Sequence, residues 1–231
     1  MKKSQVTIFI IIAVIVLILT TSIFLLNKDK TKENQINPET NEIYSYVVNC
    51  IKNSGEQSIE EFGNKSKIYF NKNQENSLLY SRKNFEKEIS PLMVKNSEEC
   101  LNKISSSFSD YEINKKNPSF TTKIEDNKIF FSLILPLTIK KQDKIYELRE
   151  FNDIEVLIRL GIINRAIYEI IDEKKLHPNS ICITCIGEIA EKYNLYIGLE
   201  YIDNSSIQFI IKDENSIINQ KSYEFKFINE Y

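Results

Sequence analysis

The sequence predicts an α+β protein in which an N-terminal transmembrane helix precedes a domain of helices and antiparallel strands. Three observations predict this fold class. Val6 to Leu26 is a run of 21 residues without a charge. Apolar residues then recur at helical spacing in four later segments, 39–63, 85–107, 154–175 and 183–193. The segments between and after these helices alternate or run apolar, as strands do.

The uncharged run is long enough to cross a membrane. At about 1.5 Å per residue a helix of this run reaches roughly 30 Å, the thickness of the hydrocarbon core. A cleaved secretory signal has an apolar core of about 7–15 residues followed by a small-residue cleavage site. This run is longer, and no Ala-x-Ala pattern follows it. We therefore favour a permanent signal anchor that contacts membrane lipid through residues 6–26.

The flanks of the run indicate its orientation. Residues 1–5 form a short cytoplasmic or leader segment that contains Lys2 and Lys3 and is too short to fold. Because the amino terminus adds to this positive charge, we expect the C-terminal domain to be extracytoplasmic. The positive-inside rule is weak here, since three lysines flank the other end of the run: Lys28, Lys30 and Lys32.

The balance of charges argues against a nucleic-acid partner. The chain has 30 Lys and Arg against 32 Asp and Glu, a formal net charge of −2. Up to Glu33 there are five Lys and two acidic residues, which leaves 25 basic and 30 acidic residues and about −5 on the soluble part. A nucleic-acid-binding face would need clustered positive charge.

The chain has four cysteines, Cys50, Cys100, Cys182 and Cys185. An even number in a domain outside a membrane fits two disulfides, and four cysteines allow three connectivities. We favour Cys50 with Cys100 and Cys182 with Cys185, because the first two each lie in a predicted helix beside an apolar residue. In a reducing compartment all four would be small core residues.

The first half of the soluble part is predicted to be mainly helical. After a linker at 27–38, a helix begins behind Pro38 and ends near Gly63, a residue typical of helix C-caps. Residues 66–82 contain two short apolar clusters that indicate short strands or a loop. The helix over 85–107 is expected to be interrupted, or to restart, at Pro91. These elements form a mainly helical lobe, 39–116.

The second half, 117–231, is predicted to be an α+β lobe. Four strands are expected from 111 onward, at 111–114, 119–125, 128–140 and 144–151, with a turn at Asp126-Asn127. Pro136 indicates a strand edge or a bulge. The alternation in 144–151 does not identify the buried face. Helices follow at 154–175 and 183–193, and the chain ends in three strands at 195–202, 206–213 and 222–228.

The strongest chemical motif is the C-x-x-C of Cys182 and Cys185. At a helix N-terminus such a pair has a lowered thiol pKa and supports dithiol exchange. Thioredoxin-like sites usually follow a strand, whereas another predicted helix precedes this motif, which favours a structural disulfide or two buried thiols. A zinc site would combine both cysteines with His177, the only histidine, but structural zinc takes four ligands. We therefore expect no metal, no cofactor and no catalytic residue.

The beginning of the chain, KKSQVTIFIII, resembles the class III signal peptides of archaeal type IV pilin-like proteins. In those proteins a basic pair precedes a small residue, then Gln, then the hydrophobic helix. The resemblance implies Lys2 and Lys3 as the basic pair, Ser4 as the small residue and Gln5 as the first residue after cleavage. Ser4 stands where Gly or Ala is usual, and Phe9 stands where true pilins often have a Glu that sets the register of subunits in a filament.

The whole chain also resembles uncharacterised single-pass surface proteins of small-genome archaea. The matching segments are VVNCI (47–51), SLILPLTI (132–139) and AEKYNLYIGLEYID (190–203). This resemblance implies an architecture in which Cys-bearing helices precede a β-rich segment and a closing strand pair. It also implies a place on the cell surface, and it carries no known activity.

Together these features lead us to expect a non-enzymatic, membrane-anchored cell-surface protein. Its α+β domain would serve adhesion, envelope organisation or the binding of an unknown protein or surface-layer partner. One alternative is a pilin-like subunit processed between Ser4 and Gln5. The other is a membrane-tethered thiol oxidoreductase that uses Cys182 and Cys185.

Overall fold

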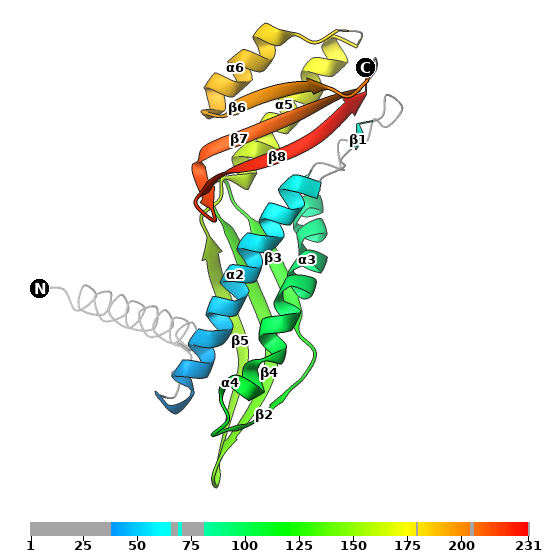
Figure 1. Cartoon of the computed structure of the whole chain (residues 1–231). Coiled ribbons are helices and arrows are strands. Elements are labelled where there is room, and N and C mark those ends of the chain that lie inside the picture. The colour runs from blue at the N-terminus through cyan, green and yellow to red at the C-terminus, as the bar shows by residue number, and fades with distance from the viewer. Residues whose placement is uncertain (1–37, 66–68, 71–80, 179, 204–205, 231) are drawn as a thin grey trace, which may run out of the picture. The chain divides into compact units, whose positions relative to one another are not determined.

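The computed structural model describes residues 38–65, 69–70, 81–178, 180–203 and 206–230 (Figure 1). The predicted membrane helix at 6–26 and the leader residues Lys2, Lys3, Ser4 and Gln5 lie outside these residues. The chain divides into two units between residues 41 and 42, and the described sheets and long helices belong to the second. In the described part of the chain no helix is both long enough and apolar enough to cross a membrane.

The second unit is a mixed α+β structure, as the sequence predicts, and its described strands form two sheets in which all pairs but one are antiparallel. A short 3-10 helix, η1 (Pro38–Thr40), precedes this unit in the sequence. The helices are α2 (Asn41–Lys65), α3 (Arg82–Asn102), α4 (Ile104–Ser107), α5 (Leu160–Leu176) and α6 (Ile183–Tyr193). The strands are β1 (Tyr69–Phe70), β2 (Glu112–Lys115), β3 (Ser119–Ile124), β4 (Ile129–Lys141), β5 (Lys144–Val156), β6 (Tyr196–Tyr201), β7 (Ser206–Ile218) and β8 (Lys221–Glu230).

The first sheet is built around β4. This strand pairs antiparallel with β2, β3 and β5. Every second residue of β4 is buried, because strand side chains alternate between the two faces of a sheet: Ile129, Phe131, Leu133, Leu135, Leu137 and Ile139. Pro136 lies within a shift of register between β4 and β5, which confirms the predicted bulge.

Helices α2 and α3 lie side by side along the buried face of this sheet (Figure 1). Ile43, Val47 and Ile51 recur at helical spacing on α2 and are all fully buried. Gly55 brings the middle of α2 close to β4, since a Cβ there would lie 2.6 Å from the ring of Phe131. The α3 helix begins at the cap residue Ser81, whose hydroxyl accepts the Asn84 N–H at 3.3 Å.

The second sheet has the order β1-β8-β7-β6, with β1 parallel to β8 and the other pairs antiparallel. One face of β7 and β8 is apolar, and its aromatic members include the stacked pair Phe209 and Phe227, whose ring centroids lie 4.8 Å apart. Helix α5 lies against this face, and its Lys174 Nζ donates to Asn229 Oδ1 of β8 at 2.7 Å. Helix α6 packs on α5.

Helices α2 and α3 meet the second sheet at an aromatic cluster formed by Phe62 of α2, Phe85 of α3 and Phe225 of β8. The ring centroids lie 5.0 to 5.6 Å apart, with Phe85 and Phe225 stacked and Phe62 edge-on to both. Beside the cluster, the buried hydroxyl of Tyr223 donates to the Ile59 carbonyl at 3.2 Å. Burial raises the pKa of Tyr223 above its usual range, so this hydroxyl stays protonated.

The predicted interruption at Pro91 and the predicted C-cap at Gly63 are wrong. Helix α3 runs through Pro91 without interruption, because the exposed proline ring faces solvent while Ile89 and Met93 are buried; the break comes later, at Lys103. Gly63 is not a C-cap either, since α2 continues to Lys65. Its role is close approach: a Cβ at Gly63 would lie only 2.4 Å from the carbonyl oxygen of Glu224 in β8.

The helix predicted from Ile154 begins only at Leu160. Residues 154–156 instead complete β5, where Ile154 pairs with Phe131 and Val156 with Ile129. Ile154, Val156 and Ile158 are buried at every second position while Leu157 is 69% exposed, which is the period of a strand. The apolar residues of 154–158 fit both the alternation of a strand and the spacing of the helix that follows. Pairing with β4 places residues 154–156 in the strand.

The boundary suggested between residues 116 and 117 falls between β2 and β3. Both strands pair with β4, so the first sheet contains strands from either side of that boundary. Of the two short clusters predicted within 66–82, Tyr69 and Phe70 form β1, and the second cluster lies outside the described residues.

We predict that Gly63→Ala destabilises the protein and that Gly187→Ala does not. The added methyl group at Gly63 must displace the backbone of β8, which typically costs about 1–3 kcal/mol. Gly187 is exposed on α6, and no atom lies within 4 Å of the position that a Cβ would take there, so alanine should add about 0.5–1 kcal/mol through helix propensity. Urea unfolding of the full chain in detergent, followed by circular dichroism, measures both. Equal stability of the two variants would contradict the close approach.

Candidate functional site

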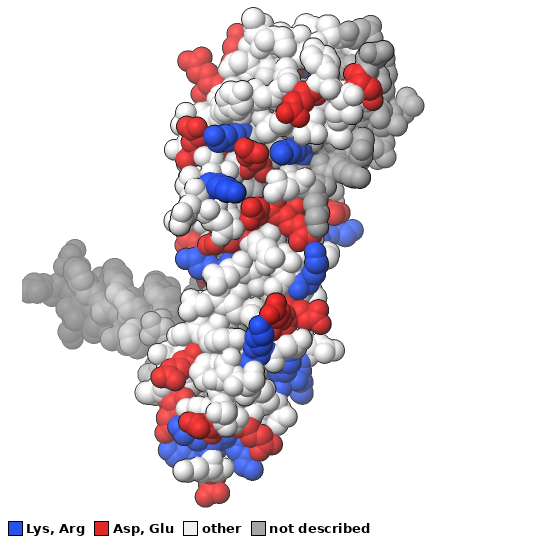
Figure 2. All heavy atoms as spheres, in the orientation of Figure 1, with Lys and Arg blue, Asp and Glu red and all other residues white. Residues whose placement is uncertain are grey.

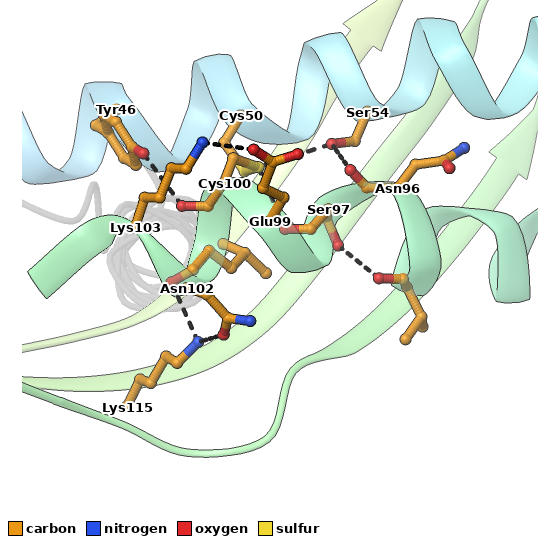
Figure 3. Close-up of a disulfide and its surroundings, with 12 residues drawn as sticks. Tyr46, Cys50, Ser54, Asn96, Ser97, Glu99, Cys100, Asn102, Lys103 and Lys115 are labelled. Atoms are coloured by element: carbon orange, nitrogen blue, oxygen red, sulfur yellow. Dashed lines mark hydrogen bonds and ion pairs between the residues drawn. A yellow bond between two sulfur atoms is a disulfide. The ribbon is translucent and has the colours of Figure 1, made fainter. Parts of the chain in front are cut away.

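One disulfide, Cys50–Cys100, links the middle of α2 to the end of α3, with the two Cα atoms 5.9 Å apart (Figure 3). Cys50 is buried and Cys100 is half-buried. The residues lie 50 positions apart in the sequence, so the bond closes a long loop. It is the pairing that the sequence analysis favoured.

Polar contacts surround this disulfide on both helices (Figure 3). The Tyr46 hydroxyl of α2 donates to the Cys100 carbonyl at 3.1 Å, and the Ser54 hydroxyl donates to the Asn96 carbonyl at 3.1 Å. On the exposed side Lys103 pairs with Glu99, a contact that lowers the pKa of Glu99 and raises that of Lys103. The polar groups around the disulfide therefore bond to one another or to main-chain carbonyls, as expected for a disulfide with a structural role.

The second disulfide, Cys182–Cys185, occupies the N-terminus of α6. Its Cα atoms lie 5.2 Å apart, and both side chains are half-buried. Cys182 is the N-cap residue, and its Sγ accepts the backbone N–H of Cys185 at 3.3 Å. The motif therefore has the position at a helix N-terminus that favours a thiolate once the bond is reduced.

The last turn of α5 brings His177 and Glu173 beside this disulfide. His177 is the C-cap residue, and its Nε2 lies 3.9 Å from Glu173 Oε2. One ligand atom from each of Glu173, His177, Cys182 and Cys185 lies within 4.8 Å of the others. His177 and the two cysteines were candidate zinc ligands from the sequence, whereas Glu173 was not, although its i, i+4 spacing from His177 on a helix is a usable signal.

A polar contact at the other end of α6 holds this helix on α5. Glu169 of α5 accepts the Tyr193 hydroxyl at 2.7 Å and pairs with Lys192, both at the end of α6. Partial burial opposes ionisation of Glu169, but the hydrogen bonds from Lys192 and Tyr193 outweigh it and keep the pKa of this carboxyl below its usual range. Polar contacts of Glu169 therefore hold α6 on α5, together with the buried side chains of Ile186 and Ile189.

A buried ion pair, absent from the sequence analysis, joins the start of α5 to β7. Arg159 Nη1 lies 3.0 Å from Asp213 Oδ1, and its Nη2 donates to the Tyr193 carbonyl at 2.7 Å. Asp213 is fully buried and also accepts from the Ser216 hydroxyl and the Asn215 N–H. The signal was present, because 207, 209, 211 and 213 alternate on one strand and place an acid on the apolar face.

We predict that removing the two disulfides has unequal costs. In the chain-entropy model the bond that closes a loop of 50 residues contributes about 4 kcal/mol at 25 °C, and one that closes three residues contributes about 1.5 kcal/mol. Cys50→Ser with Cys100→Ser should therefore lower the free energy of unfolding more than Cys182→Ser with Cys185→Ser. Denaturant midpoints of the two double variants test the order, and the reverse order would contradict it.

We also predict that Arg159→Met is strongly destabilising. It leaves the Asp213 carboxylate buried without its cation, a change that typically costs about 3–5 kcal/mol. Arg165→Met is the matched control, because Arg165 pairs with Asp126 at 3.0 Å between side chains about 40% exposed, and such pairs contribute about 0–1 kcal/mol. A loss of less than 1 kcal/mol for Arg159→Met in thermal or urea unfolding would show that the ion pair is dispensable.

No protein-family model, no curated protein and no solved structure matches the chain.

Proposed function

We propose that the chain is a non-enzymatic, single-pass membrane protein that presents its α+β domain outside the cell for adhesion, envelope organisation or partner binding. The observation that carries this proposal is that all four cysteines are paired in disulfides. Disulfides form and persist in oxidising compartments such as the cell exterior and are rare where thiols are kept reduced.

Two further features support the proposal. The 21 uncharged residues of 6–26 have the length of a membrane anchor, and they precede a domain that a long-range disulfide stabilises. On the face shown in Figure 2, Lys and Arg are interspersed with Asp and Glu in the middle and lower parts, and no large patch of Lys and Arg gathers among the described residues. A mixed surface of this kind suits a protein or surface-layer partner better than nucleic acid.

Labelling of intact cells tests the location. Asp143 is exposed in the turn between β4 and β5, so the thiol of Asp143→Cys should react with a membrane-impermeant maleimide without permeabilisation. Lys2→Cys, on the other side of the anchor, is the matched control and should react only after permeabilisation. The reverse pattern, or recovery of the chain in the soluble fraction after lysis, would refute the proposal.

A pilin-like subunit is the first alternative, and the KKSQ segment supports it. N-terminal sequencing of the mature protein separates the two hypotheses. A chain that begins at Gln5 indicates processing after Ser4, whereas an intact Met1 excludes it. Processing alone would leave the external domain in place, so filaments must also be sought by electron microscopy.

A membrane-tethered thiol oxidoreductase is the second alternative, favoured by the position of Cys182 and Cys185 at the N-terminus of α6. In dithiol exchange one thiolate would attack a substrate disulfide and the second would resolve the mixed disulfide. If Cys182 and Cys185 resist both reductant and alkylating agent in the folded protein, this hypothesis fails.

A further inference from the structure

The cluster of Glu173, His177, Cys182 and Cys185, where α5 ends and α6 begins, has the composition of a metal site. Glu173 and His177 come from the last turn of α5, and Cys182 and Cys185 come from the first turn of α6. We propose that reduction of the Cys182–Cys185 disulfide converts this cluster into a four-ligand zinc site. The four ligands are the two Cys Sγ atoms, the His177 imidazole and the Glu173 carboxylate.

The geometry needs only small movements. Zinc bonds of about 2.0–2.3 Å in a tetrahedral site place ligand atoms about 3.3–3.8 Å from one another. His177 Nε2 and Glu173 Oε2 are already 3.9 Å apart, and all four ligand atoms lie within 4.8 Å. The two sulfur atoms must separate, which Cα atoms 5.2 Å apart allow by side-chain rotation, and the other ligand pairs must close by about 1 Å or less.

The donor set selects the metal. Two thiolates with one imidazole suit Zn²⁺, whereas Mg²⁺ and Ca²⁺ require mainly oxygen ligands. A fourth ligand closes the coordination sphere, as in structural zinc sites, and Glu173 supplies it. His177 and the two cysteines alone supply three ligands, and Glu173 completes the four that a structural zinc site takes.

Groups around the sulfur atoms favour their anionic form. The Cys185 N–H already donates to Cys182 Sγ at 3.3 Å, and the Thr184 hydroxyl lies 3.4 Å from the same sulfur. Both sulfurs lie at the N-terminus of α6, whose dipole stabilises negative charge. The contact of Glu169 with Lys192 and Tyr193 holds α6 on α5, and therefore holds the two ligand pairs together.

Electrons and protons balance in two steps. A dithiol reductant transfers two electrons to the disulfide, which yields two cysteine thiols and the cyclic disulfide of the reductant. Zn²⁺ then binds the two sulfurs as thiolates and releases two protons. Because a disulfide sulfur has no thiolate to offer, the oxidised and the zinc-bound states exclude each other, and the cluster is a redox-controlled metal site.

Metal binding by the full chain in detergent tests this inference. A phosphine is the suitable reductant, since it reduces the disulfide by taking oxygen from water and does not compete for zinc as a dithiol does. We expect the reduced chain to take up one equivalent of Zn²⁺, measured by competition with a chromogenic chelator. We expect Co²⁺ to show the visible bands of a tetrahedral site together with a thiolate-to-cobalt band. The oxidised chain should show neither.

Variants assign the ligands. His177→Gln and Glu173→Gln should each weaken zinc binding by at least about 10-fold, the scale of losing a supporting group at a metal site. Cys182→Ser with Cys185→Ser should abolish uptake, which excludes the reduced Cys50 and Cys100 as the ligands. Glu191→Gln, on the exposed side of α6, is the matched control and should bind as the parent does.

Three results would overturn the inference. They are uptake by the oxidised chain equal to that of the reduced chain, unchanged affinity in His177→Gln, and uptake that survives loss of Cys182 and Cys185. Unchanged affinity in Glu173→Gln alone would overturn the four-ligand assignment. None of these results bears on the proposed location at the cell surface, which depends on the anchor and on labelling of intact cells.

Discussion

The arrangement of the two sheets depends on the contact between Phe62, Phe85 and Phe225. This contact joins the helices that cover the first sheet to a strand of the second. Helices α2 and α3 cover the first sheet, and the ends of these helices that carry Phe62 and Phe85 reach β8 of the second. Aromatic pairs at such distances add about 0.5–1.5 kcal/mol each beyond the burial of their area. The close approach of Gly63 to β8 and the ion pair of Arg159 with Asp213 act at the same junction, so shape and charge support the aromatic contact.

Much of the fold could be predicted from local pattern. The alternation along 129–139 reports a half-buried strand because one face meets helices and the other meets solvent. Helical spacing located α2, α3 and α6 to within a few residues, and the favoured pairing of Cys50 with Cys100 followed from their matching places on two helices. These features follow from short stretches of sequence that have one stable way to bury their apolar residues.

What could not be predicted depends on partners far along the chain. The local sequence of residues 154–156 is compatible with a helix, but these residues form a strand because they pair with β4. Gly63 is typical of a helix C-cap in sequence, but in the structure it allows the close approach of α2 to β8. At the candidate site the two cysteines and His177 were visible, but Glu173 became a fourth member only when α6 folded back on α5. Side-chain clusters of this kind are properties of the packed elements and leave only weak traces in the sequence.

The Cys50–Cys100 bond has a mechanical consequence in the proposed membrane-anchored state. A pulling force that enters the domain at residue 42 acts first on the beginning of α2. It can unwind about two turns before it reaches Cys50, where the covalent bond passes the load to α3. Beyond the bond, the two helices share the load, so further unwinding of α2 no longer proceeds residue by residue without also pulling on α3.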